Sequence, residues 1–118
     1  MKGQSLRRRM GFALNGLQLT FRRERSFRTQ LLGALAVLAL LVVTRPAPLW
    51  WAVLILTAGF VLVTELLNSA LETLIDHLHP EQHPEIGAVK DMAAGAVLVS
   101  SLIAVAVALF FVLAQLDF

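Results

Sequence analysis

The sequence contains no cysteine, which excludes a disulfide framework and a thiolate metal site. It also has no Walker A motif, no glycine-rich kinase loop and no His-Arg-Asp sequence, so its motifs exclude the soluble kinase classes. No internal repeat or low-complexity segment divides the 118 residues, which suffice for one compact domain.

Acidic residues are nearly absent from the first half, where Glu24 is the single acid before position 65. Eight of the ten basic residues lie before position 30, and seven of the eight acids lie after position 60. The chain is also 58% hydrophobic, above the soluble average. A basic end followed by apolar runs indicates a membrane surface and argues against nucleic acid, which would need a soluble fold. We therefore expect a single-domain, all-α integral membrane protein.

The basic N-terminal segment has the pattern of an amphipathic helix over about residues 5–24. Its apolar side chains recur at steps of three and four residues: Leu6, Met10, Ala13, Leu14, Leu17 and Phe21. Such a helix lies in the lipid interface with its arginines at the headgroups. A secretory signal peptide does not fit, because the apolar core starts too late and no small-residue cleavage site follows it.

Three apolar segments predict three transmembrane helices, at about residues 27–44, 49–76 and 90–116. Pro46 and Pro48 predict a tight turn between the first two, and Trp50 and Trp51 are placed for an aromatic belt. We expect residues 77–89 to form a polar loop. By the positive-inside rule, this loop and the arginine-rich N-terminus lie on the cytoplasmic side.

A stripe of polar side chains runs along the second predicted span: Glu65, Asn68, Ser69, Glu72 and Asp76. At about 100° per residue, all of them lie within about 60° of Glu65 around a helix. A carboxylate on an apolar membrane helix is costly in lipid, so the stripe has to face protein, water or a cation. We therefore expect the functional site here.

Other acids are predicted at the same membrane face. Glu24 and Glu72, on different helices, can hold a hard divalent cation such as Mg²⁺ together with substrate phosphates. Lys90 and Asp91 begin the third predicted span, where backbone N–H groups and a lysine favour phosphate. Glu65 lies deeper, at a depth suited to deprotonating a lipid hydroxyl. These placements suggest phosphoryl transfer from Mg-ATP to a lipid alcohol.

Two motifs are specific: Glu65-Leu66-Leu67-Asn68-Ser69-Ala70-Leu71-Glu72 with Asp76, and Lys90-Asp91-Met92-Ala93-Ala94-Gly95-Ala96-Val97. A shorter element, Glu24-x-x-Phe27-Arg28, precedes them. Over about residues 10–115 the chain resembles the small prokaryotic diacylglycerol kinase and undecaprenol kinase family. The resemblance implies an ATP- and Mg²⁺-dependent lipid kinase of the bacterial inner membrane. It further implies three membrane helices and a surface helix, assembled as a homotrimer with active sites between neighbouring subunits.

The resemblance also implies roles for particular residues. Glu65 would be the catalytic base and Asn68 would support the lipid and phosphate geometry. Glu24 and Glu72 would be the metal-linked carboxylates. The nucleotide-binding residues would be Glu24, Glu72, Glu81, His83, Lys90 and Asp91, and the lipid substrate would meet Arg28, Glu65 and Ser69.

The sequence departs from the family pattern at three places. Gln30 stands where some members carry an acid, and Pro84 follows His83 in place of an acid. The family arginine near the start of the surface helix has no single match among residues 7–9. The small residues at 93–96 favour the undecaprenol branch over the diacylglycerol branch.

Other interpretations of these residues stay open. Glu65 suits a proton-coupled transporter, and a membrane adaptor needs no chemistry from the stripe at all. Asn68 could instead form a hydrogen bond that joins two helices. Glu24 and Glu72 could instead form surface salt bridges. A zinc site is a further alternative at His77, His79 and His83.

Overall fold

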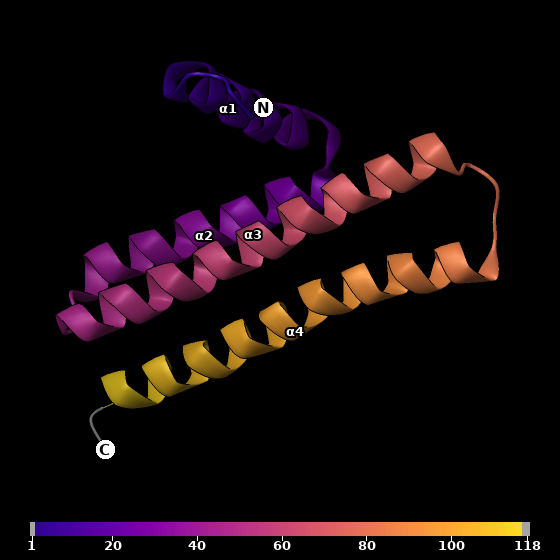
Figure 1. Cartoon of the computed structure of the whole chain (residues 1–118). Helices are drawn as coiled ribbons and strands as arrows, with labels where there is room; N and C mark the ends of the chain where they lie inside the picture. Colours follow the sequence, from indigo (N-terminus) through magenta and orange to yellow (C-terminus); the bar gives the residue numbers. More distant parts are fainter. Residues whose placement is uncertain (1, 117–118) are drawn as a thin grey trace.

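Four α-helices form this structure, a computed structural model that describes residues 2–116. The helices are α1 (Leu6–Arg23), α2 (Arg25–Thr44), α3 (Pro48–Leu78) and α4 (Pro84–Gln115). Helices α2, α3 and α4 form an up-and-down bundle in which α3 packs against both of the others. Helix α1 leaves the bundle at the start of α2 and lies beside that end (Figure 1). The all-α fold expected from the sequence is confirmed.

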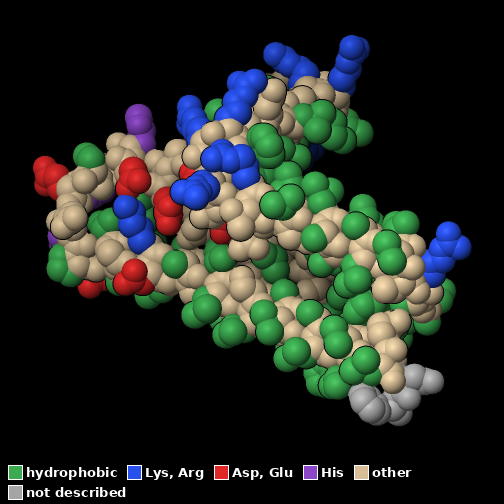
Figure 2. Space-filling model, turned by 180° about the vertical axis from the view of Figure 1, so that it is seen from behind, with side chains coloured by type: hydrophobic (Ala, Val, Ile, Leu, Met, Phe, Trp, Pro, Cys, Tyr) green, Lys and Arg blue, Asp and Glu red, His purple; other side chains and the backbone are tan. Residues whose placement is uncertain are grey.

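Helices α2, α3 and α4 are each long and apolar enough to cross a membrane, so the number of candidate spans is the three that the sequence predicts. Their outer surfaces are covered by apolar side chains, whereas lysine and arginine gather over α1 and its junction with α2 (Figure 2). Acidic side chains gather at the end of the bundle that carries the α3–α4 connection (Figure 2). The charge asymmetry of the sequence thus becomes one polar end on a long apolar body.

A small packed core holds the opposite end of the bundle. Leu41, Leu54 and Phe111, from three different helices, are buried together, and the rings of Trp50 and Phe111 meet edge to face at 5.3 Å. Such an aromatic pair adds about 1 kcal/mol to the burial of its surface. This contact fixes the three spans to one another far from the polar end.

The α2–α3 turn is as tight as its prolines predict. Arg45 adopts a left-handed conformation (φ 47°, ψ 57°), and its N–H donates to the Leu41 carbonyl at 2.9 Å. Pro48 is then the first residue of α3, where a missing N–H costs no hydrogen bond.

The α3–α4 connection differs from the expected loop over residues 77–89. Helix α3 continues to Leu78, and α4 already begins at Pro84. Pro80 cannot continue α3, and Pro84 suits the first helical position because its φ is fixed there. The His83 side chain accepts a hydrogen bond from the Glu85 N–H at 3.1 Å and caps the new helix. The third predicted helix therefore starts before residue 90.

A charged side chain fixes the corner between α1 and α2. The Arg28 Nη1 atom donates to the carbonyls of Phe21 (2.7 Å) and Arg22 (3.1 Å), which are among the free carbonyls at the end of α1. The chain turns at Glu24, which is extended (φ −108°, ψ 107°) and half-buried. The corner therefore turns Glu24 toward α3.

The left-handed Arg45 gives a test of the turn. Arg45→Gly should raise the free energy of unfolding by roughly 0.5–1 kcal/mol, because glycine adopts this conformation without a Cβ penalty. Arg45→Val should lower it by about 1–2 kcal/mol, because a branched Cβ fits the left-handed region poorly. Thermal unfolding of the purified protein in one detergent measures both changes. Equal stability of the two variants would contradict this conformation.

Candidate active site

The polar stripe expected from the sequence is present on one face of α3. Glu65 and Ser69 are buried, with 4% and 5% of their surfaces exposed, and Asn68 and Glu72 are half-buried. The Asn68 Nδ2 atom donates to Glu72 Oε1 at 3.5 Å. The Asn68 Oδ1 atom is buried and has no hydrogen-bond partner in the described part of the chain. A buried acceptor without a partner is uncommon, and a water, an ion or a substrate group would satisfy it.

Two further carboxylates lie near the buried Glu65. They are Glu24, from the α1–α2 corner, and Glu72, from α3, and both are near enough for their charge to reach it. Like charges repel, so binding of a cation or of a proton lowers the electrostatic repulsion among these carboxylates. Among residues 2–116, no three acidic or histidine side chains converge closely enough to hold a metal by themselves. Carboxylate oxygens and the free amide oxygen nevertheless form an oxygen-donor set that suits Mg²⁺, which takes one or two carboxylates and completes its shell with water and phosphate.

A cavity of about 440 Å³ opens between α1 and α3, and of the three carboxylates Glu24 lines it. Ser69, Thr73 and His77 line it as well, and Leu19 and Leu66 provide an apolar side. The cavity therefore has both polar and apolar walls, and Ser69 lies one helical turn after the buried Glu65. It can accept a molecule with a polar end and an apolar chain.

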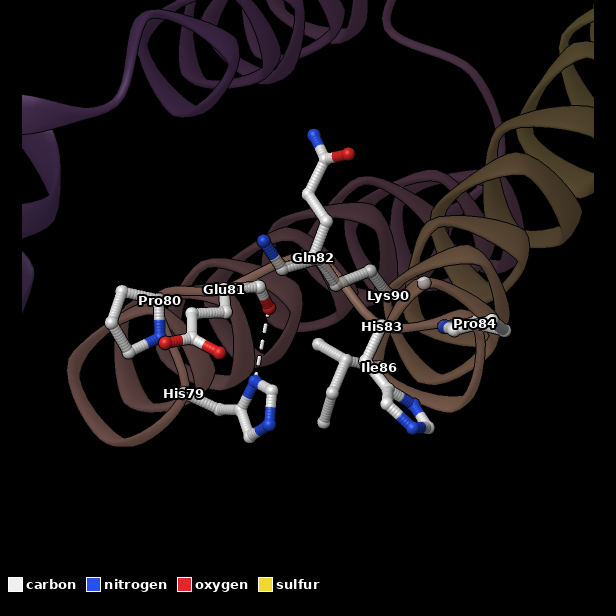
Figure 3. Close-up of a pocket in the computed structure, with 9 residues that line it drawn as sticks. His79, Pro80, Glu81, Gln82, His83, Pro84, Ile86 and Lys90 are labelled. Carbon is white, nitrogen blue, oxygen red and sulfur yellow. Dashed lines mark hydrogen bonds between the residues drawn. The ribbon is translucent and has the colours of Figure 1, made fainter.

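A second cavity of about 550 Å³ lies at the α3–α4 connection and is lined by His79, Glu81, His83 and Lys90 (Figure 3). The His79 ring nitrogen Nδ1 lies 3.0 Å from the Glu81 carbonyl oxygen. The expected nucleotide residues Glu81, His83 and Lys90 are thus brought to one hollow. Asp91 is exposed on α4 next to Lys90.

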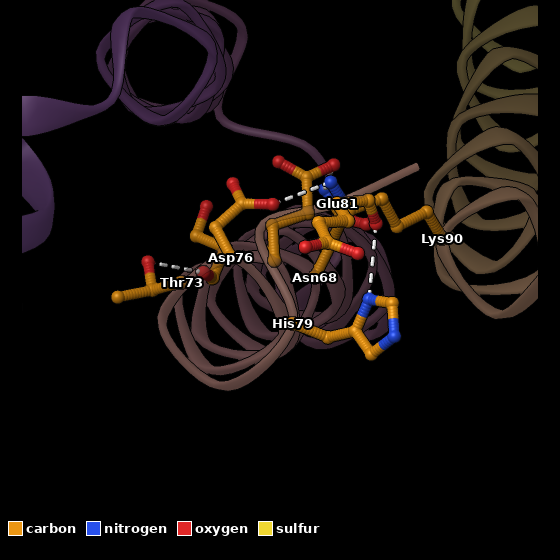
Figure 4. Close-up of polar contacts among 8 residues, drawn as sticks. Asn68, Thr73, Asp76, His79, Glu81 and Lys90 are labelled. Carbon is orange, nitrogen blue, oxygen red and sulfur yellow. Dashed lines mark hydrogen bonds and ion pairs between the residues drawn. The ribbon is translucent and has the colours of Figure 1, made fainter. Parts of the chain in front are cut away.

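An ion pair joins the water-facing ends of α3 and α4. The Lys90 Nζ atom lies 2.5 Å from Asp76 Oδ1 (Figure 4), and both side chains are partly exposed. The sequence predicts Lys90 and Asp91 at the N-terminus of the third helix, and this prediction is wrong. Because α4 begins at Pro84, the N–H groups at positions 90 and 91 lie within the helix and are not free for phosphate. Only the side chains remain available.

Comparison with known proteins identifies the family of this chain. The family model described as prokaryotic diacylglycerol kinase matches residues 11–112. The chain belongs to this family.

Individual relatives carry two different names. An undecaprenol kinase of Bacillus subtilis is 35% identical over 101 residues, which cover 86% of this chain and 82% of that protein. A diacylglycerol kinase of Synechocystis is also 35% identical, over 97 residues that cover 81% of this chain and 55% of the longer relative. The diacylglycerol kinase of Escherichia coli is 30% identical over 95 residues, or 80% of this chain and 78% of that one. Family membership confirms the resemblance inferred from the motifs, and with it the lipid kinase assignment.

Some site features were not found from the sequence. The pairing of Asp76 with Lys90 and the place of Thr73 and His77 at the α1–α3 cavity were not expected. A spacing of 14 residues across two prolines gives no periodic signal for the ion pair. Arg28, assigned to the lipid substrate from the resemblance, directs Nη1 to the end of α1, and its contact with lipid stays a prediction.

The exposed ion pair should contribute little to stability. Asp76→Asn is expected to change the free energy of unfolding by less than about 1 kcal/mol, because solvent and salt screen partly exposed charges. Unfolding in detergent at low and high salt measures the change, with Glu85→Gln as a control that removes an exposed acid of α4. A loss above about 2 kcal/mol would assign the pair a structural role that its exposure does not predict.

Proposed function

We propose that this protein transfers the γ-phosphate of ATP to the hydroxyl of a membrane lipid alcohol, either diacylglycerol or undecaprenol. The observation that carries the proposal is the buried Glu65, which shares a helix face with Ser69 of the α1–α3 cavity and lies near enough to two further carboxylates to feel their charge. Relatives named for each lipid support both acceptors.

The depth of Glu65 in the membrane supports a lipid acceptor. Glu65 lies 17 residues after Pro48, the start of α3, which is about 25 Å along the helix axis. A hydrocarbon core about 30 Å thick then ends near Asn68, and Glu72 projects beyond it. A base at Glu65 would meet a hydroxyl at the lipid headgroup. A phosphate donor would reach the same face from water.

The reaction follows from these positions. The Glu65 carboxylate would take the proton of the lipid hydroxyl, and the hydroxyl oxygen would attack the γ-phosphorus of ATP. The bond from the γ-phosphorus to the bridging oxygen would break, and ADP would leave with that oxygen. Asn68 would orient the reacting groups through its free Oδ1 atom. Glu24 and Glu72 would hold Mg²⁺ with the phosphate oxygens, where the ion would supply positive charge.

The proposal includes the setting of the enzyme. Helix α1 would lie as an amphipathic helix in the interface, with its arginines at the headgroups. The N-terminus and the α3–α4 connection would face the cytoplasm at the bacterial inner membrane, where ATP is available. Three copies would form a homotrimer with sites shared between subunits. The exposed apolar surfaces of the bundle leave room for neighbouring copies as well as lipid.

The proposal is tested by phosphate transfer from γ-labelled ATP in mixed micelles, with diacylglycerol and undecaprenol supplied in parallel. Glu65→Gln keeps the shape of the side chain and removes its basicity, so it should lower kcat by about 10²-fold or more and retain nucleotide binding. Glu85→Gln, a change of the same type at an exposed acid, should keep normal activity. If the intact protein transfers phosphate to neither lipid, the lipid kinase function is contradicted and a proton-coupled transporter is favoured.

Removal of divalent cations gives a separate test. EDTA should abolish transfer, and added Mg²⁺ should restore it. Glu24→Gln and Glu72→Gln should each raise the Mg²⁺ concentration for half-maximal activity by about tenfold, because each removes one proposed ligand charge. The measurement is a Mg²⁺ titration at saturating ATP and lipid. Unchanged titrations in both variants would contradict the proposed metal ligands.

A further inference from the structure

Two hydroxyl side chains meet between α3 and α4 in the apolar part of the bundle. The Thr64 Oγ1 and Ser100 Oγ atoms are 2.9 Å apart, and their residues are 8% and 0% exposed. Thr64 lies about 24 Å from the start of α3 and Ser100 about 22 Å from the end of α4, so both lie within the hydrocarbon. Among the described residues, this contact and the Asp76–Lys90 pair are the side-chain hydrogen bonds that join α3 to α4.

The hydrogens of the two hydroxyls make the contact geometrically demanding. Thr64 Oγ1 also lies 2.9 Å from the Val61 carbonyl, and Ser100 Oγ lies 2.9 Å from the Val97 carbonyl. Two hydroxyl hydrogens serve three short contacts, so one hydroxyl donates across the interface while the other donates to its own helix. Either hydroxyl can be the one that donates across the interface, and in both cases each hydroxyl hydrogen has an acceptor. In both cases Thr64 of α3 has to face Ser100 of α4. The pair therefore favours one rotation of α3 relative to α4.

The rotation of α3 decides where Glu65 points. Thr64 and Glu65 are neighbours in the sequence and lie about 100° apart around the helix. Thr64 faces α4, whereas Glu65 shares a helix face with Ser69, which lines the α1–α3 cavity together with Glu24. A side-chain tip about 6 Å from the helix axis moves by about 2 Å when the helix turns by about 20°. Such a shift is large for a base that has to reach a hydroxyl within hydrogen-bonding distance.

The two contacts between α3 and α4 also enclose the site along the helix. Thr64 pairs at the deep end and Asp76 pairs at the water-facing end, and Glu65, Asn68 and Glu72 lie between them. The Asp76 pair is partly exposed and screened. The hydroxyl pair is buried next to the proposed base, so it is the contact that can hold the base in place.

We propose that Thr64 and Ser100 are positioning residues for phosphoryl transfer, because their contact sets the rotation of α3 that directs Glu65 to the lipid hydroxyl. The inference rests on the proposed function, in which Glu65 is the base. A contact that only stabilised the bundle would act differently. It would lower stability and leave kcat of the folded enzyme unchanged, since side-chain hydrogen bonds between membrane helices contribute modestly to stability.

The test separates kcat from KM in variants that keep the side-chain shape. Thr64→Val and Ser100→Ala should each lower kcat by about three- to thirtyfold with an unchanged KM for ATP, because the base is misdirected while the nucleotide site is intact. Thr64→Ser, which keeps the hydroxyl, should restore most of the activity. The double variant should be no worse than the more damaging single variant, because either change already breaks the contact.

A matched control distinguishes loss of the contact between Thr64 and Ser100 from loss of a threonine hydroxyl elsewhere on α3. Thr57 lies on the same helix, and its hydroxyl donates only to the Val53 carbonyl of its own helix at 2.6 Å. Thr57→Val should keep normal kcat. In Thr64→Val the Ser100 hydroxyl still donates to Val97, so no buried donor is left unpaired and the protein should remain folded. Wild-type kcat in Thr64→Val, or an equal loss in Thr57→Val, overturns the inference.

A cross-link tests the geometry without any assay of activity. The chain has no cysteine, so Thr64→Cys combined with Ser100→Cys introduces a single thiol pair. Mild oxidation should form a disulfide within one chain, seen by mass and by loss of free thiols. Thiols that stay free, or that join two chains, contradict the facing of α3 and α4. If the wild-type protein shows no phosphate transfer, the proposed function is contradicted. If the wild type is active and Thr64→Val has the same kcat, only the positioning role is contradicted.

Discussion

A carboxylate buried in an apolar membrane helix is the constraint on which this structure depends. Glu65 has 4% of its surface exposed, and lipid cannot solvate its charge. The nearby acids Glu24 and Glu72 repel that charge, so a proton or a bound cation has to offset it. Glu24 comes near Glu65 because the chain turns back between α1 and α2, where Arg28 binds the end of α1. The surface helix and the spans thus form one site together.

Helix α3 packs against α2 and α4 and borders the α1–α3 cavity, so its polar side chains have different partners. Ser69 of the acidic stripe lines that cavity, whereas Asp76 at the end of the stripe pairs with Lys90 of α4, and Thr64 outside the stripe meets Ser100 of α4. At the far end, Leu41, Leu54 and Phe111 hold the three spans by apolar packing alone. Packing of this kind resists separation of the helices but permits small rotations, whereas a directional hydrogen bond does not. Polar contacts are therefore concentrated at the end where chemistry needs a defined geometry.

Much of the fold could be predicted from the sequence because membrane helices are recognised by their long apolar runs. The spans, the proline turn and the acidic stripe followed from apolar run length, Pro46 and Pro48, and helical periodicity. The start of α4 did not follow, because Pro80, Pro84 and Gly87, among charged and histidine side chains, are typical of a loop. Hydropathy detects where a helix enters lipid, whereas the helix itself starts at the Pro84 cap. The same error placed Lys90 at a helix terminus that lies two turns earlier.

The sequence by itself determined that this protein is helical, that it crosses a membrane and that Glu65, Asn68 and Glu72 share one face. These properties are local, since each depends on residue type and on spacing within one helix. Only the tertiary structure decided that Glu24 acts on Glu65, that Asp76 holds Lys90 and that Thr64 meets Ser100. Those pairs join different helices, and the rotation and register of packed helices depend on many side chains at once. No spacing in a single sequence records them.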